Sequence, residues 1–181
     1  MKVAILASGR GSNFVALQKA IRRGELAAKI VIVISDCQDA GVLQKAESFG
    51  IPTNYIQGGK KFCVKVVEEL KKLDVELVCL AGLMRIIRSP LLEAFPNKII
   101  NIHPSLLPKH PGKEAWKQAL KDGATETGCT VHFVDSGMDT GEIILQRRVP
   151  ILDGDTPESL HSRIQEAEYV AYTEALQMLQ K

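Results

Sequence analysis

The 181-residue sequence has few features of a metalloprotein, a secreted protein or a membrane protein. Its four cysteines, Cys37, Cys63, Cys79 and Cys129, show no C-x-x-C or other metal spacing, and a disulfide framework is not expected at this length and spacing. The first apolar run breaks at Gly9, too early for a signal peptide. No run approaches the ~20 apolar residues of a membrane-spanning helix. We therefore expect a reduced, cytoplasmic protein with no metal and no membrane segment.

The sequence also lacks an excess of charge of either sign. The formal net charge is +2, and the basic pairs are scattered along the chain instead of forming one run. A nucleic-acid-binding footprint is therefore absent. The hydrophobic content of 45% suits a soluble globular protein, and the length suits one domain with one sizeable core. We expect small molecules as partners, and either a monomer or a homodimer.

Continuous apolar runs alternate with helical periodicity over the first hundred residues. Such runs are typical of strands covered on both faces, and helical spacing of apolar residues appears between them. Strands alternating with helices imply right-handed crossovers and a mostly parallel sheet. We therefore predict a Rossmann-like α/β fold with helices on both faces. The expected strands lie at residues 3–7, 30–34, 52–56, 75–81 and 98–102, and the expected helices at 14–21, 43–50, 62–73 and 90–95.

The alternation stops after a short helix predicted over residues 115–120. Residues 130–134 and 143–145 are strand-like, and the spacer between them is rich in turn residues. We expect these two strands to run antiparallel. Thr156 and Pro157 mark the start of a long C-terminal helix, with a cap and a proline at its first position.

A glycine loop at residues 8–13 (SGRGSN) follows the first predicted strand, and Ser12 is the expected N-cap of the next helix. Phe14 replaces the third glycine of a dinucleotide-binding fingerprint, and no P-loop lysine follows. The free N–H groups of such a helix start favour an anion. We interpret the loop as a cradle for one phosphate; the alternative is a tight turn without a ligand.

The stretch from Asn101 to Gly112 carries an amide, two imidazoles and three prolines just after an apolar pair. Asn101 and His103 are two residues apart, so they share a face if the strand continues through them. An amide beside an imidazole can hold an oxyanion and handle a proton. Asp139, 36 residues after His103 (139 − 103), lies in another predicted loop and could orient the imidazole. The alternative is a surface turn with an incidental histidine.

Neither Ser105 nor any cysteine has the sequence context of an activated nucleophile. The substrate is therefore expected to bring its own nucleophile, such as an amine, and the reaction to be direct group transfer between two bound molecules. One of them would carry the phosphate.

Three stretches, at residues 8–13, 101–108 and 138–141, resemble the phosphoribosylglycinamide formyltransferases, a folate-dependent family of purine biosynthesis. The resemblance covers nearly the whole chain. It implies one formyltransferase domain over residues 1–181, with ribonucleotide phosphate bound in the N-terminal half and folate and the catalytic residues in the C-terminal half. It also implies that the amine of glycinamide ribonucleotide attacks the formyl carbon of the co-substrate 10-formyltetrahydrofolate, through a tetrahedral intermediate.

The resemblance further implies a role for individual residues. Asn101 and His103 would stabilise the tetrahedral oxyanion, and Asp139 would hold His103 and help move the proton to the departing folate nitrogen. The other site residues contact either the ribonucleotide or the folate. The folate pocket has an apolar slot that suits the pteridine and an arginine that suits a carboxylate. The expected ribonucleotide contacts are Gly11, Ser12, Asn13, Gln165 and Glu168, and the expected folate contacts are Met84, Arg85, Ile86, Ile87, Asp135 and Met138.

The sequence departs from the family pattern at two places. Residues 113–116 read Lys-Glu-Ala-Trp where many members have a histidine soon after Pro-Gly, and Glu142 stands where proline is common. The remaining histidines, His110, His132 and His161, are expected to be structural.

Two alternative functions are weighed against this one. Another formyl-folate enzyme, a hydrolase or a transferase with a different acceptor, would be expected to carry an extra domain that this sequence lacks. A non-catalytic nucleotide-binding module would leave Asn101, His103 and Asp139 without a shared role.

Overall fold

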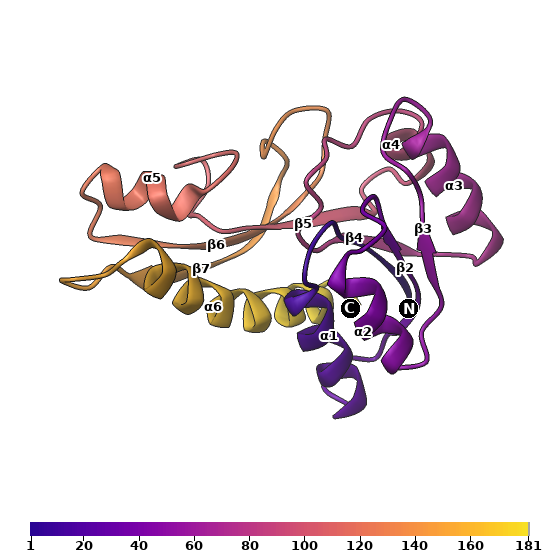
Figure 1. Cartoon of the computed structure of the whole chain (residues 1–181), viewed down its shortest axis with the longest axis horizontal. Coiled ribbons are helices and arrows are strands. Elements are labelled where there is room, and N and C mark those ends of the chain that lie inside the picture. The colour runs from indigo at the N-terminus through magenta and orange to yellow at the C-terminus, as the bar shows by residue number, and fades with distance from the viewer. Residues whose placement is uncertain (181) are drawn as a thin grey trace.

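The computed structural model of the protein describes residues 1–180, in which the strands form a single mixed sheet (Figure 1). The strands are β1 (Lys2–Leu6), β2 (Lys29–Ser35), β3 (Thr53–Tyr55), β4 (Leu77–Leu80), β5 (Ile99–His103), β6 (Glu126–Phe133) and β7 (Ile143–Pro150). The helices are α1 (Ser12–Arg22), α2 (Gly41–Ser48), α3 (Phe62–Lys72), α4 (Leu91–Ala94), α5 (Ala115–Lys121) and α6 (Pro157–Met178).

The sheet order is β3-β2-β1-β4-β5-β6-β7. The first five of these strands pair in parallel, whereas β6 is antiparallel to both β5 and β7. A strand order that reverses beside β1 places the carboxyl ends of β1 and β4 at a crevice where open α/β sheets bind ligands. The predicted Rossmann-like fold with antiparallel C-terminal strands and a long last helix is confirmed.

Two apolar cores lie on the two faces of the sheet. Because side chains alternate along a strand, Val3 and Ile5 of β1 enter one core, while Ala4 and Leu6 enter the other. The first core is covered by α1, α2 and α6, and the second by α3 and α4 (Figure 1). The strands β1, β2, β4 and β5 contribute residues to both cores, as their continuous apolar runs predict, whereas the short strand β3 is half-buried to exposed.

The long helix α6 is held against the strand ends by one buried hydroxyl. The Tyr172 side chain is fully buried, and its hydroxyl donates to the carbonyl oxygens of Leu80 at 3.0 Å and Ile100 at 3.3 Å. These carbonyls belong to β4 and β5, the strands that lead into the predicted site. Tyr172 therefore places α6 beside the carboxyl edge of the sheet.

Two local predictions require correction. Ser12 is not the N-cap of α1 but its first residue, and the N-cap is Gly11 in the left-handed region, with φ 74° and no side-chain cap. The strands predicted at 130–134 and 143–145 are both longer in the structure. The extra residues of β6, Glu126–Cys129, are polar or small, and three of the four are buried. The extra residues of β7, Gln146–Pro150, alternate between more exposed and more buried positions. Neither segment is an apolar run.

None of the helices in residues 1–180 combines the length and the apolar character that a membrane crossing requires.

Candidate active site

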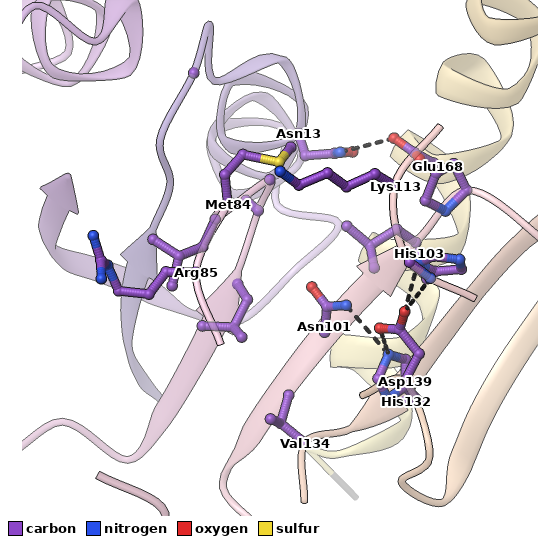
Figure 2. A pocket seen from close by; sticks show the side chains of 18 of the residues that line it. Asn13, Met84, Arg85, Asn101, His103, Lys113, His132, Val134, Asp139 and Glu168 are labelled. Atoms are coloured by element: carbon purple, nitrogen blue, oxygen red, sulfur yellow. Dashed lines mark hydrogen bonds and ion pairs between the residues drawn. The ribbon is translucent and has the colours of Figure 1, made fainter. Parts of the chain in front are cut away.

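A cavity of about 530 Å³ opens at the carboxyl edge of the sheet, between the loops that follow β1, β4 and β5. Every residue assigned to the site from the sequence lines this cavity, including those on α6 and in the loop after β6 (Figure 2). These residues are Gly11, Ser12, Asn13, Met84, Arg85, Ile86, Ile87, Asn101, His103, Asp135, Met138, Asp139, Gln165 and Glu168. Segments more than 150 residues apart in the chain therefore meet at one place.

His103, at the end of β5, is buried and has a partner on each ring nitrogen. Its Nε2 lies 2.9 Å from the carbonyl oxygen of His110, and because a carbonyl only accepts, Nε2 carries the hydrogen. Its Nδ1 lies 3.4 Å from Oδ2 of Asp139. The Asp139 carboxylate therefore faces the ring nitrogen that the His110 carbonyl does not contact, and it orients the imidazole.

Asp139 is fixed by more than its histidine partner. The backbone N–H of Gly112 donates to Asp139 Oδ2 at 2.9 Å, and Asp139 itself has a left-handed backbone with φ 56°. Aspartate is one of the few residues that tolerates this conformation. The turn after β6 thus presents the carboxylate to His103 and at the same time anchors the loop that carries Gly112.

His132 joins this group, although from the sequence alone it is expected to be structural. Its Nδ1 lies 2.8 Å from the Phe133 carbonyl oxygen and so carries the hydrogen, which leaves Nε2 to accept from Asn101 Nδ2 at 3.2 Å. Burial lowers the pKa of His132, which favours this neutral form. The amide of Asn101 is thereby oriented, and its second N–H remains for a ligand.

The structure shows why His132 is next to Asn101. In the antiparallel pairing of β5 and β6, Asn101 lies directly opposite His132, and opposed residues of neighbouring strands touch on the same face. The second oxygen of Asp139 lies 3.7 Å from His132 Nε2. Knowledge of the β5–β6 register would identify His132 as a neighbour of Asn101, but this register cannot be predicted from the sequence.

The glycine loop forms the other end of the cavity. Residues 9–13 line it, and the first N–H groups of α1 have no acceptor within their own helix. The Oδ1 atom of Asn13 is buried and has no hydrogen-bond partner in residues 1–180. A ligand with a hydroxyl or amine group would supply the donor that this oxygen lacks.

Glu168 of α6 faces Asn13 across the cavity. It is only 6% exposed, and Asn13 Nδ2 donates to its Oε2 at 2.9 Å. Burial raises the pKa of Glu168 to about 7, and the hydrogen bond from Asn13 opposes this in part. A carboxyl group that titrates near neutrality and contacts a cavity is suited to a polar ligand.

The buried carboxyl makes a pH-dependent contribution to stability. Between about pH 4.5 and 7 the folded protein keeps a proton on Glu168 that the unfolded chain releases, so this contribution falls as pH rises through that window. Glu168→Gln removes the burial of the anion. We expect its free energy of unfolding, relative to the parent protein, to increase by about 2–3 kcal/mol from pH 5 to pH 8.5. Urea denaturation at both pH values measures this difference, and two parallel pH profiles would contradict it.

The predicted folate side of the cavity is apolar and open. Met84, Ile86 and Met138 are all at least half exposed, whereas Ile87 is buried. Exposed apolar side chains gathered around a cavity mark a ligand surface. This is the end of the site that can take a flat aromatic ring.

Arg85 is already engaged within the protein. Its Nε lies 3.3 Å from Oδ2 of Asp36, and its guanidinium stands 5.2 Å from the ring centroid of Phe62. In Figure 2 the Arg85 side chain points away from the Asn101 and His103 side of the cavity. Asp36 accepts in turn from Ser8 Oγ at 2.6 Å, so Arg85 ties the loop after β4 to the glycine loop.

The two departures from the family pattern, at residues 113–116 and at Glu142, differ in whether they line the cavity. Trp116 stacks on His161, with ring centroids 3.8 Å apart and an interplanar angle of 6°, and both residues line the cavity. The stack joins α5 to α6, so His161 contributes to the wall of the site. Glu142 is exposed and is not among the lining residues. Within residues 1–180, no three His, Cys, Asp or Glu side chains gather as ligands for a metal ion.

Comparison with known proteins agrees with this geometry. The family model described as formyl transferase matches residues 1–176. The crystal structure of glycinamide ribonucleotide transformylase 1 from Symbiobacterium toebii superimposes with a TM-score of 0.96 at 44% identity, over 99% of this chain and 87% of that one.

The sequence relatives include proteins of about the same length as this chain and much longer proteins. The phosphoribosylglycinamide formyltransferase of Bacillus subtilis is 40% identical over 98% of this chain and 94% of its own length. The trifunctional purine biosynthetic protein adenosine-3 of Drosophila pseudoobscura is 47% identical over 98% of this chain, which spans 14% of the length of that protein. The site geometry and these similarities lead to one conclusion: the chain belongs to the formyl transferase family.

Proposed function

We propose that the protein transfers the formyl group of 10-formyltetrahydrofolate to the amine of glycinamide ribonucleotide in de novo purine biosynthesis. The observation that carries the proposal is the meeting of Asn101, His103 and Asp139 with a phosphate-type loop in one cavity. The similarity to the Bacillus subtilis phosphoribosylglycinamide formyltransferase over nearly the full length of both chains supports the choice of acceptor.

In the proposed reaction the amine attacks the formyl carbon, a new C–N bond forms, and the carbonyl oxygen becomes an oxyanion. The imidazole of His103 and the free amide N–H of Asn101 stabilise that oxygen. Each such donor typically contributes about 10²–10³ in rate. The amine then gives up its proton, with Asp139 as acceptor or relay, and the bond to folate N10 breaks as that nitrogen receives a proton. No nucleophile from the protein is required.

The two substrates divide the cavity. We assign the phosphate and ribose to Gly11, Ser12, Asn13, Gln165 and Glu168, where Asn13 Oδ1 lacks a donor and Glu168 titrates near pH 7. The pteridine of 10-formyltetrahydrofolate, the co-substrate, is assigned to the apolar end with Met84, Ile86, Ile87 and Met138, beside Arg85 and Asp135. In this assignment residues 1–181 act as one formyltransferase domain in which both halves of the chain contribute to each substrate: the glycine loop and α6 contact the ribonucleotide, and the loops after β4 and β6 contact the folate.

We further propose a reduced cytoplasmic setting, supported by four cysteines that are all free. Two small molecules are the expected partners, and the chain would act as a monomer or a homodimer.

The test is spectrophotometric loss of the formyl group from 10-formyltetrahydrofolate, with and without glycinamide ribonucleotide. Loss that requires the ribonucleotide and yields one formylated product per folate supports the proposal. Equal loss without it would indicate a hydrolase. A folded protein with no turnover would favour the nucleotide-binding module or a different acceptor.

His132 provides a test of how the oxyanion donor is oriented. His132→Leu removes the acceptor that holds the Asn101 amide. We expect kcat to fall about tenfold with little change in either KM, because a misoriented amide weakens only the hydrogen bond that stabilises the transition state. His132→Gln keeps an acceptor oxygen and should recover most of the activity. Equal losses in the two variants would show that His132 acts through packing alone.

A further inference from the structure

Lys113 is one of the residues at which the sequence departs from the family pattern, and nothing in the proposed mechanism uses it. It lines the cavity, and its side chain is exposed. Figure 2 shows this side chain extended across the cavity, with its ammonium directed in that view toward the side of Met84 and Asn13. Lys113, from the loop after β5, and the glycine loop line the same cavity.

The backbone around Lys113 is held in place while the side chain is not. On one side, the Gly112 N–H donates to Asp139 Oδ2 at 2.9 Å. On the other, the Lys113 carbonyl accepts from Gln118 Nε2 at 2.8 Å. Within residues 1–180, no carboxylate forms an ion pair with the Lys113 ammonium. A fixed anchor with a free cation is suited to bind an anion with little loss of backbone entropy.

The acidic groups of the cavity have other partners. Asp139 faces His103, and Glu114, the residue next to Lys113, pairs with Lys117. Burial keeps Glu168 largely uncharged below about pH 7. Asp135, the remaining carboxylate of the cavity, accepts from Thr140 Oγ1 at 2.7 Å. A positive charge at the glycine-loop end of the cavity adds to the favourable field of the α1 N-terminus.

We propose that the Lys113 ammonium binds the phosphate monoester of the acceptor substrate and closes the cradle that residues 9–13 form on the other side. This inference rests on the proposed function for its acceptor, a phosphorylated ribose that carries an amine. It adds a cationic contact from a loop far from the glycine loop in sequence. The contact lies one residue from Gly112, which holds Asp139.

The test compares glycinamide ribonucleotide with its dephosphorylated riboside as acceptors. Lys113→Ala should lower kcat/KM about five- to tenfold with the phosphorylated acceptor, the size of a partly exposed charge-assisted contact. The same substitution should leave the riboside reaction unchanged, and Lys113→Arg should retain most of the activity. Lys109→Ala is the matched control, since Lys109 is exposed on the same loop but does not line the cavity. Equal losses with both acceptors, or a raised KM for 10-formyltetrahydrofolate alone, would overturn the assignment.

A binding measurement separates this inference from the proposed function. Isothermal titration calorimetry with ribose 5-phosphate and with ribose requires no formyl transfer. We expect ribose 5-phosphate to bind the parent protein more tightly than Lys113→Ala, with ribose showing no such difference. If ribose 5-phosphate binds both proteins equally, Lys113 does not contact phosphate, whether or not the protein transfers formyl groups.

Discussion

The variant His103→Ala is expected to remain folded. We expect its kcat to fall about 10³-fold, with smaller changes in KM. The substitution removes the imidazole that the His110 carbonyl and Asp139 hold in place at 2.9 Å and 3.4 Å. In the proposed mechanism this group is needed most when the formyl oxygen becomes negative, so the loss should fall on the transition state. Steady-state kinetics with both substrates measures it.

His110 provides the matched control. Its imidazole pairs with Asp122 at 3.0 Å and is not among the groups that line the cavity. Because His110 has φ 53°, asparagine is the suitable replacement. His110→Asn should keep activity within about twofold. Full activity in His103→Ala, with an unchanged melting temperature, would remove His103 from the mechanism.

Gly11→Ala is expected to have the largest effect on stability, a loss of about 3–5 kcal/mol. Gly11 has φ 74°, and a Cβ added there would lie 2.5 Å from Val42 Cγ2 and 2.9 Å from Val42 Cα. The Cα atom belongs to the backbone of α2 and cannot rotate away. The glycine loop or α2 must therefore move, and ribonucleotide binding should be lost with the stability.

Substitutions at two other glycines distinguish the cost of a strained backbone from the cost of a steric clash. Gly24 has φ 76° with open space around its Cβ position, and Gly9 has neither a left-handed backbone nor a neighbour within 4 Å. Gly24→Ala should lose about 1 kcal/mol of unfolding free energy, and Gly9→Ala close to none. Chemical denaturation of the three variants gives the order. A Gly11→Ala loss no larger than that of Gly24→Ala would show that α2 adapts without cost.

Much of the site could be predicted because its signals are local. Asn101 and His103 are two residues apart, and the strand does continue through both, so they share the cavity. Asp139 lies in the turn-rich loop after β6, where the sequence places two acids; since β6 is antiparallel to β5, strand direction alone does not bring that loop to His103, and the contact itself is seen only in the structure. Residue spacing is enough for the first of these inferences.

The missed features depend on contacts between distant segments. His132 reaches Asn101 through the β5–β6 register, and a register irregularity between Val131 and His132 alters its pairing with β7. The pairing of Arg85 with Asp36 joins two loops that are 49 residues apart. Neither contact has a signature in composition or periodicity, because each depends on how the strands are aligned in the folded sheet.

The proposed reaction is direct transfer of the formyl group between two bound substrates, without water. A single turnover with 10-formyltetrahydrofolate labelled with heavy oxygen in the formyl group tests it, with the product analysed by mass spectrometry. The tetrahedral intermediate of direct attack contains only that one oxygen, so formylglycinamide ribonucleotide should retain the full label. Loss of the label, or release of labelled formate before product appears, would mean that hydrolysis precedes formylation and would contradict the mechanism.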